Sequence, residues 1–312
     1  MLKHLNRVTD HLRGRLRKKG IDFNPYDNVT RERIAEGLLR QNMHREPLGS
    51  VHRSRMLLDM IEEGFPTETL ASAYFENLDS LLKSRQPRQV DGQIVLGVGT
   101  GRCGSTSLVE VLATVEESCC THENPALISW VPQQSEIDFH MRRFERLSKY
   151  FSLVADVSHW WINVLEEVFD NFPDAKVVGL LRDVDSCVKS FMQIKGFGRG
   201  SYNHWVPYGN GIWAAAQWDP TYPTYAVPDG CGSDPDAAKS GLIARYVREY
   251  NEKLRFIASR APGRVLLVRT EELNSASALA SIFDFIGRNG QVTGIQRNVG
   301  TTVDGRNPKF RF

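Results

Sequence analysis

The sequence predicts a three-layer α/β protein: a central parallel β-sheet with a phosphate-loop-like turn, helices on both faces, and a helical N-terminal extension. From about residue 91 onward, short apolar runs alternate with amphipathic helical stretches. A glycine-rich turn follows the first of these apolar runs and leads into a helix. Alternation of this kind implies βαβ units with right-handed crossovers. We therefore expect a helical extension over 1–90 and an α/β domain over 91–312.

The N-terminal extension carries helical periodicity. Its clearest segment places apolar residues on one face, at Leu70, Ala73, Tyr74, Leu78, Leu81 and Leu82. The helix should end before Gln86 and Pro87, because proline disfavours the helical conformation of the residue before it. The first twenty residues are basic. They could form a membrane-surface or targeting helix, or a terminal helix with a solvated basic face.

The α/β domain should contain five strands. We expect them at Ile94–Val98, Ser118–Thr121, Leu153–Asp156, Val177–Leu181 and Val265–Val268. Helices are expected between and after them, near 106–115, 136–150, 162–171, 184–194, 237–260 and 277–287. Ligands of parallel sheets gather at the carboxyl ends of the strands. The residues that follow each strand are therefore the candidates for a site.

Composition narrows the class of protein. The chain has 312 residues, of which 41% are hydrophobic and 24% charged, as in ordinary globular domains. A net charge of +2 gives no reason to expect a nucleic-acid partner. No apolar run reaches transmembrane length, and the five cysteines follow no metal-ligand spacing. We expect a cytoplasmic protein without a transmembrane segment, metal site or disulfide framework; its oligomeric state is left open.

The turn after the first strand has the features of an anion-binding loop. Residues 94–108 read IVLGVGTGRCGSTSL, so glycines precede small hydroxyl residues at a helix N-terminus. Gly99 and Gly104 have the G-x-x-x-x-G spacing of a nucleotide-triphosphate loop, but Ser105 stands where that motif requires lysine. The basic residue is Arg102, inside the loop. The loop is predicted to hold phosphate differently from a kinase or NTPase.

A second phosphate signal follows the fourth predicted strand, within VVGLLRDVDSCVKSF at 177–191. Arg182 leaves the strand, Asp183 can cap the next helix, and Ser190 lies two turns along it. Arginine suits bidentate recognition of phosphate. Together with the glycine loop, the pair suggests two separate phosphates on one nucleotide.

These motifs together resemble the sulfotransferases that use 3′-phosphoadenosine 5′-phosphosulfate (PAPS). A strand followed by R-x-G-[ST]-[ST] is similar to their 5′-phosphosulfate loop. LRDVDSCVKSF resembles their 3′-phosphate motif, in which arginine and serine are eight residues apart, as Arg182 and Ser190 are. FPDAKVVGLLRD resembles the run into that motif, and VLLVRTEELN with LASIFDFIG resembles the final strand and helix. The resemblance covers about 93–288.

The resemblance implies a donor site and a reaction. PAPS would be the donor and 3′-phosphoadenosine 5′-phosphate (PAP) the product, without a metal. Arg102 would stabilise the leaving phosphate, while Arg182 and Ser190 would bind the 3′-phosphate. The phosphosulfate would be bound by consecutive loop residues, Gly101, Arg102, Cys103, Gly104, Ser105, Thr106 and Ser107. Transfer to a hydroxyl or amine would be an in-line displacement.

The acceptor must lose a proton, so a general base is expected at a neighbouring strand end. Glu123 follows the second strand, about where one branch of the family keeps a catalytic glutamate. His159 follows the third strand, close to where another branch keeps its histidine, and His122 is a third candidate. Each of them could instead be a turn or capping residue. The family keeps a lysine in its third-strand motif, but Asp156 and Ser158 stand there in this sequence. The sequence therefore leaves open which branch of the family the chain resembles.

An aromatic insertion at about 196–235 interrupts the α/β pattern. It is too rich in glycine and proline for a long helix and too aromatic for a disordered linker. It could form a lid over the site, or a loop that covers its own hydrophobic patch. A flat or apolar small-molecule acceptor would suit such a surface. We expect acceptor contacts from His122, Trp160, Trp205, Trp213, Trp218 and Tyr222.

Two other classes of function fit the sequence less well. A P-loop kinase for small molecules would lack its main contact to the β- and γ-phosphates, since no lysine follows Gly104. Residues 153–156 could nevertheless form its magnesium-binding strand, with Asp156 as the ligand. The third reading is a non-catalytic nucleotide-binding module whose helical extension mediates assembly.

Overall fold

The structure is a computed structural model that describes residues 67–122, 130–193, 206–208, 212–214, 225–226, 229–230 and 234–290. These residues fall into two compact units, divided between Leu81 and Leu82. The first contributes helix α4 (Thr67–Leu82), in which Tyr74, Phe75 and Leu78 are buried. The helix predicted for this segment is confirmed. The remaining N-terminal predictions lie outside the described residues.

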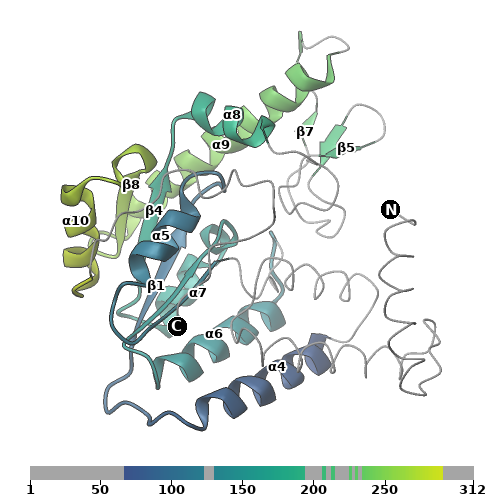
Figure 1. The fold of residues 1–312 in the computed structure, drawn as a ribbon. Helices are drawn as coiled ribbons and strands as arrows, with labels where there is room; N and C mark the ends of the chain where they lie inside the picture. The colour runs from purple at the N-terminus through teal and green to yellow at the C-terminus, as the bar shows by residue number, and fades with distance from the viewer. Residues whose placement is uncertain are drawn as a thin grey trace, which may run out of the picture. The chain divides into compact units, whose positions relative to one another are not determined.

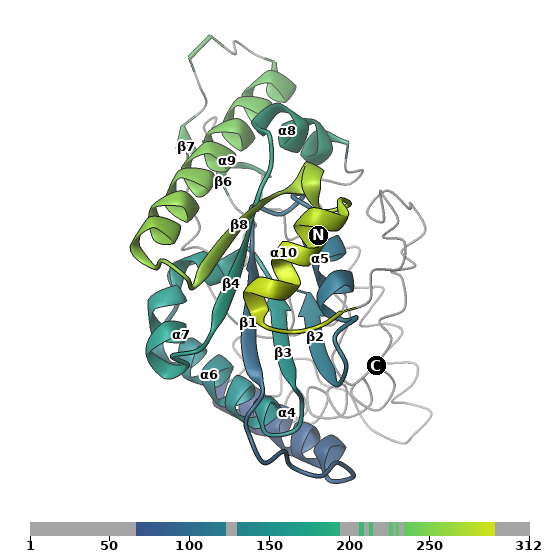
Figure 2. The ribbon, with the colours of Figure 1, turned by 90° about the vertical axis from the view of Figure 1, so that its left-hand side faces the viewer.

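The second unit contains a five-stranded sheet, of which Figure 1 labels β1, β4 and β8. The strand order is β2-β3-β1-β4-β8, as Figure 2 shows, and every neighbouring pair is parallel. The strands are β1 (Gln93–Val98), β2 (Ser118–His122), β3 (Leu153–Val157), β4 (Lys176–Leu181) and β8 (Val265–Arg269). Each predicted strand is present and ends within one residue of its predicted bounds. The prediction succeeded because central strands of a parallel sheet are buried on both faces and read as continuous apolar runs.

Helices cover both faces of this sheet, which confirms the three-layer α/β class. α5 (Ser105–Leu112) and α10 (Ala276–Ile286) lie on one face (Figure 2). The other face carries α6 (Gln134–Ser148), which contacts β1 and β3, and α9 (Pro235–Arg260), which contacts β8. Shorter elements complete the unit: η1 (Trp160–Asn163), α7 (Leu165–Asn171), α8 (Val184–Met192) and η2 (Thr270–Glu272).

The core between α5, α10 and the sheet depends on a close approach at Gly97. A Cβ on Gly97 would lie 2.6 Å from Val157 Cγ2 and 2.8 Å from Leu108 Cδ2. Leu108 and Leu112 on α5 and Ile282 on α10 are fully buried in this layer. The absence of a side chain at Gly97 lets α5 pack directly on β1, which brings the helix N-terminus to the carboxyl end of the strand.

The aromatic insertion contains a small antiparallel sheet in the order β5-β6-β7. Its strands are β5 (Val206–Tyr208), β6 (Ile212–Ala214) and β7 (Tyr225–Ala226). The sequence predicted a structured loop but no strands, because each strand is only two or three residues long between glycines and prolines. Trp213 lies in β6, whereas Trp205, Trp218 and Tyr222 lie outside the described residues.

Helix α6 buries a histidine in an apolar environment. His140 is 1% exposed, and its ring lies edge-on to Trp161 and Phe139, with ring centroids 5.0 and 5.2 Å apart. Neither ring nitrogen has a hydrogen-bond partner among the described residues. Burial, and secondarily the charge of Arg143, lowers the pKa of His140 well below its ordinary value of 6.5. His140 is therefore neutral in the folded protein.

We expect His140→Leu to stabilise the protein, and increasingly so in acid. A buried polar group without a partner costs about 1–3 kcal/mol. The histidine of the unfolded chain takes up a proton near pH 6.5, whereas that of the folded chain does not. The free energy of unfolding of the wild type therefore decreases as pH falls below 6.5, by up to about 1.4 kcal/mol per pH unit. Urea unfolding of both proteins between pH 7.5 and 5 measures the difference. Phe139→Leu is the control, since it removes no titrating group. Parallel pH profiles for wild type and His140→Leu would contradict the prediction.

Candidate active site

The loop between β1 and α5 has an unusual backbone. Gly101, Arg102 and Gly104 have φ angles of 76°, 53° and 87°. Glycine adopts this left-handed region without a steric penalty, whereas arginine does so at a cost that is typical of functional sites. Gly104 is the N-cap of α5, and Ser105, Thr106 and Ser107 form the first turn of the helix. The loop therefore presents a tight turn at a helix N-terminus, as predicted.

Consecutive carbonyl groups of this loop are bonded by side chains from distant elements. Tyr246 Oη donates to Thr100 O at 3.2 Å, and Cys187 Sγ donates to Gly101 O at 3.6 Å. Arg182 Nη1 donates to Arg102 O, and Thr270 Oγ1 donates to Cys103 O at 2.6 Å. In a trans peptide the N–H points opposite to the C=O. Each following N–H, from residues 101 to 104, therefore points away from the side chain that holds its carbonyl. Backbone N–H groups in such a turn form an anion-binding concavity.

Cys103 contributes to the loop through its backbone. Its side chain is fully buried, and burial raises the pKa of the thiol to about 12. A Cβ on Gly99 would lie 2.4 Å from Cys103 Sγ, so the thiol packs beneath the start of the loop. The group is therefore a neutral packing element and can donate to an anion only through its N–H.

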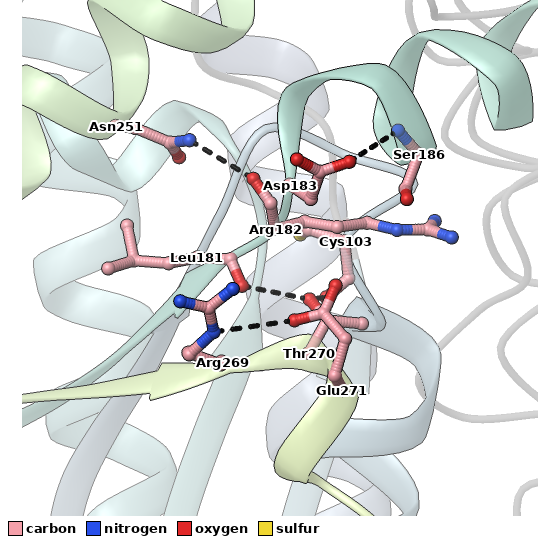
Figure 3. A network of polar contacts seen from close by, with 9 residues as sticks. All are labelled: Cys103, Leu181, Arg182, Asp183, Ser186, Asn251, Arg269, Thr270 and Glu271. Carbon is pink, nitrogen blue, oxygen red and sulfur yellow. Dashed lines mark hydrogen bonds and ion pairs between the residues drawn. The ribbon is translucent and has the colours of Figure 1, made fainter.

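The second predicted phosphate motif lies beside the loop (Figure 3). Asp183 accepts a hydrogen bond from Ser186 N at 2.9 Å and caps α8, as predicted. Asn251 Nδ2 donates to Arg182 O at 3.3 Å from α9. Arg182 Nε is buried and has no hydrogen-bond partner among the described residues.

The two predicted motifs are in direct contact. Arg102 Nε donates to Ser190 Oγ at 3.2 Å, and Arg182 Nη1 donates to the carbonyl of Arg102. The sequence assigned Arg102 to one phosphate and Ser190 to the other. In the folded chain both arginines and the serine form one connected cluster between β1, β4 and α8. This places two arginine side chains beside the loop that leads into α5.

The three candidate bases have different surroundings. His122 ends β2 and is half-buried, with its Nε2 2.9 Å from Ser105 Oγ at the start of α5. His159 is 3% exposed and packs between the rings of Trp130 and Trp160, with centroids 6.4 and 4.6 Å away. Glu123 lies outside the described residues, directly after His122. His122 thus contacts a side chain at the end of the loop, that of Ser105.

Asp156 belongs to a buried polar network at the ends of β2 and β3. Its carboxylate accepts hydrogen bonds from Thr121 Oγ1 at 2.5 Å and from Trp161 Nε1 at 2.7 Å. Arg143 Nη2 donates to Thr121 Oγ1 at 3.1 Å. Burial raises the pKa of Asp156, and the charge of Arg143 opposes that rise. Because both oxygens of Asp156 are bonded to protein groups, the structure offers no support for the magnesium-binding role considered above.

An aromatic cluster behind the loop was missed by sequence reasoning. Trp130, Tyr246 and Tyr250 lie with ring centroids 5.7–6.3 Å apart. Tyr250 Oη donates to His159 O at 2.8 Å. Trp160, a predicted acceptor contact, is 2% exposed and packs against His159 within this layer. The four-residue spacing of the two tyrosines on the buried face of α9 was the available signal.

Within the described ranges, no group of three or more His, Cys, Asp or Glu side chains could hold a metal ion. Nor is any helix in that part of the chain long and apolar enough to cross a membrane.

The structure is an α/β protein whose first strand leads through a glycine-rich loop into the N-terminus of helix α5. Residues 94–273, more than half of the chain, match the family described as the sulfotransferase domain. The chain therefore belongs to that family. Membership supports a transferase activity, and at the family level that activity is sulfotransfer.

Comparisons with solved structures find sulfotransferases of low identity. The sulfotransferase domain of the Synechococcus PCC 7002 olefin synthase is 14% identical, with coverage of 67% of this chain and 78% of that chain and a TM-score of 0.42. Sulfotransferase STF1 from Mycobacterium tuberculosis H37Rv is 13% identical, with 83% of both chains covered and a TM-score of 0.44. No curated protein matches the chain. The family assignment rests on the match of residues 94–273.

Proposed function

We propose that the protein transfers a sulfuryl group from PAPS to a hydroxyl or amine of a small-molecule acceptor. The observation that carries this proposal is the contact between the two predicted phosphate motifs. Arg182 donates to the carbonyl of Arg102, and Arg102 donates to Ser190 at 3.2 Å. A donor with anionic groups at both its 5′ and 3′ positions requires two cationic subsites at short range.

The residues present fit such a donor. The carbonyls of residues 100–103 are hydrogen-bonded to side chains. The N–H groups of the same peptides point away from those side chains and are suited to bind a 5′-phosphosulfate. The N-terminus of α5 adds a favourable dipole for an anion. The planar guanidinium of Arg182, which lies beside the loop, suits bidentate recognition of a 3′-phosphate.

The groups of the loop would act on the reaction in two ways. Bound PAPS would supply the sulfuryl group, whose bond to the 5′-phosphate breaks as the acceptor atom attacks in line. The loop N–H groups and Ser105, Thr106 and Ser107 would orient the phosphosulfate. Arg102 would stabilise the negative charge that develops on the leaving phosphate.

A base at the carboxyl end of β2 would accept the acceptor's proton. Glu123 is our first candidate, and the contact of its neighbour His122 with Ser105 at 2.9 Å supports a base at this end of the sheet. His122 itself is the second candidate. His159, 3% exposed between two tryptophans, is the third. Trp160 and the insertion residues Trp205, Trp213, Trp218 and Tyr222 remain proposed acceptor contacts, together with His122.

The proposal is tested by ligand-dependent stability and by turnover. We expect PAP to raise the melting temperature of the protein, because a ligand that binds the folded state alone stabilises it by mass action. Mg-ATP should have no such effect. Transfer of label from PAPS to members of an acceptor library would then identify the substrate. Stabilisation by Mg-ATP alone would favour the kinase, and PAP binding without turnover on any acceptor would favour the non-catalytic module.

A further inference from the structure

We propose that Thr270 is a positioning residue for the anion-binding loop. Its hydroxyl orients the peptide between Cys103 and Gly104 and ties the loop to the strand end that carries Arg182. This inference rests on the proposed donor site, and it adds to that site a residue from the last strand of the sheet.

The contacts of Thr270 join two segments that are far apart in the sequence. Thr270 begins η2, directly after β8, and its side chain lies between the loop and the end of β4 (Figure 3). Its Oγ1 is 2.6 Å from Cys103 O and 3.2 Å from Leu181 O. A hydroxyl has one proton, so the two carbonyls share it, with the shorter contact to Cys103.

The contact to Cys103 fixes a particular N–H group. The carbonyl of Cys103 and the N–H of Gly104 belong to one planar peptide. Holding the carbonyl therefore sets the direction of the Gly104 N–H, at the point where the φ angle of 87° turns the chain into α5. Without the hydroxyl, the Cys103 carbonyl would lose this 2.6 Å bond and the peptide plane could rotate.

The side chain of Thr270 is itself held in place. A Cβ on Gly104 would lie 3.1 Å from Thr270 Cγ2 and 3.0 Å from Leu273 Cδ1, so both side chains pack closely against the loop. Leu273 is buried, and its N–H donates to Thr270 O at 3.3 Å. The hydroxyl thus acts from a packed position, as a precise positioning group requires.

The second contact closes a ring of interactions around the donor site. Leu181 directly precedes Arg182, whose Nη1 donates to Arg102 O. The ring runs from the loop through Thr270 and Leu181 to Arg182 and back to the loop. A disturbance at Thr270 should therefore weaken the 5′ subsite directly, through Gly104, and the 3′ subsite only through the longer contact to Leu181.

The test compares Thr270→Val, which keeps the shape but removes the hydroxyl, with Thr270→Ser, which keeps the hydroxyl. Calorimetric titrations with PAP and with adenosine 3′-monophosphate, which lacks the 5′ group, separate the two subsites. We expect Thr270→Val to weaken PAP about ten-fold, the size of one lost buried hydrogen bond, and adenosine 3′-monophosphate much less. Thr270→Ser should bind both ligands as the wild type does.

A ligand-free measurement separates this inference from the proposed function. Amide hydrogen exchange over residues 99–108 should accelerate in Thr270→Val and not in Thr270→Ser. Thr270→Ala, which also removes the packed methyl, is the second variant should valine prevent folding. If the wild type fails to bind PAP while exchange still accelerates, the donor assignment is wrong and the positioning role stands. Equal losses for both ligands, no change in exchange, or a serine variant as weak as valine would overturn the positioning role.

Discussion

Replacing Glu123 by glutamine is expected to lower kcat by about 10²–10⁴-fold, the usual contribution of a general base. The affinity for PAP should stay unchanged, because the variant keeps the size of the side chain and the base acts on the acceptor and not on the donor. Glu123 directly follows His122, whose imidazole contacts Ser105 at the start of α5 at 2.9 Å. Single-turnover rates and PAP titrations of the variant measure the two quantities separately.

Two histidine variants are the matched controls for this experiment. His122→Asn and His159→Asn each remove an imidazole while keeping a polar side chain. If Glu123 is the base, the pH–rate profile of both controls should keep the side of the bell-shaped curve that reports the base. Glu123→Gln should lack that side. A fully active Glu123→Gln protein would contradict the assignment, and a loss of the same limb in His122→Asn would then move the role to His122.

Replacing Arg182 by alanine is expected to abolish the preference for 3′-phosphorylated nucleotides. Arg182 is the proposed 3′-phosphate ligand, and it also donates to the carbonyl of Arg102. Its loss therefore removes a charged contact and releases the Arg102–Cys103 peptide of the 5′ loop. We expect PAP to bind roughly 100-fold more weakly, the scale of lost hydrogen bonds to charged groups. Titrations with PAP and adenosine 5′-monophosphate measure the preference.

Two further variants, one at Arg182 and one at another arginine, supply the controls for Arg182→Ala. Arg182→Lys keeps the charge but not the planar fork, so we expect it to restore only part of the affinity. Arg264→Ala removes a guanidinium that also donates to a backbone carbonyl, that of Phe172 at 2.9 Å, at the opposite end of β8. It should leave nucleotide preference intact. An Arg182→Ala protein that still prefers PAP would refute the proposed orientation of the nucleotide.

The fold was predictable because its signals are local. The five strands are buried apolar runs between turn residues, and the helices between them show their own periodicity. The spacing of Gly99 and Gly104 predicted the turn between β1 and α5, and Asp183 predicted the cap of α8. The small sheet of the insertion was not predictable, since its strands of two or three residues depend on pairing with one another.

The candidate site was predictable in part. Arg102 and Arg182 were identified from their positions after strands and Ser190 from its eight-residue spacing from Arg182, and the three meet in the structure. The support behind them was not visible. Thr270 reaches Cys103 across 167 residues and Tyr246 reaches Thr100 across 146, separations over which no local pattern carries information.

Residue patterns alone were sufficient for the sheet, the turn at 99–104 and the two arginines, because strand burial, glycine backbone freedom and strand-end position are properties of short segments. Only the folded chain decides that the loop carbonyls are held by Tyr246, Cys187, Arg182 and Thr270, and that His159 is enclosed by tryptophans while His122 touches Ser105. The physical reason is that hydrogen-bond partners and burial are set by which distant segments the sheet brings together.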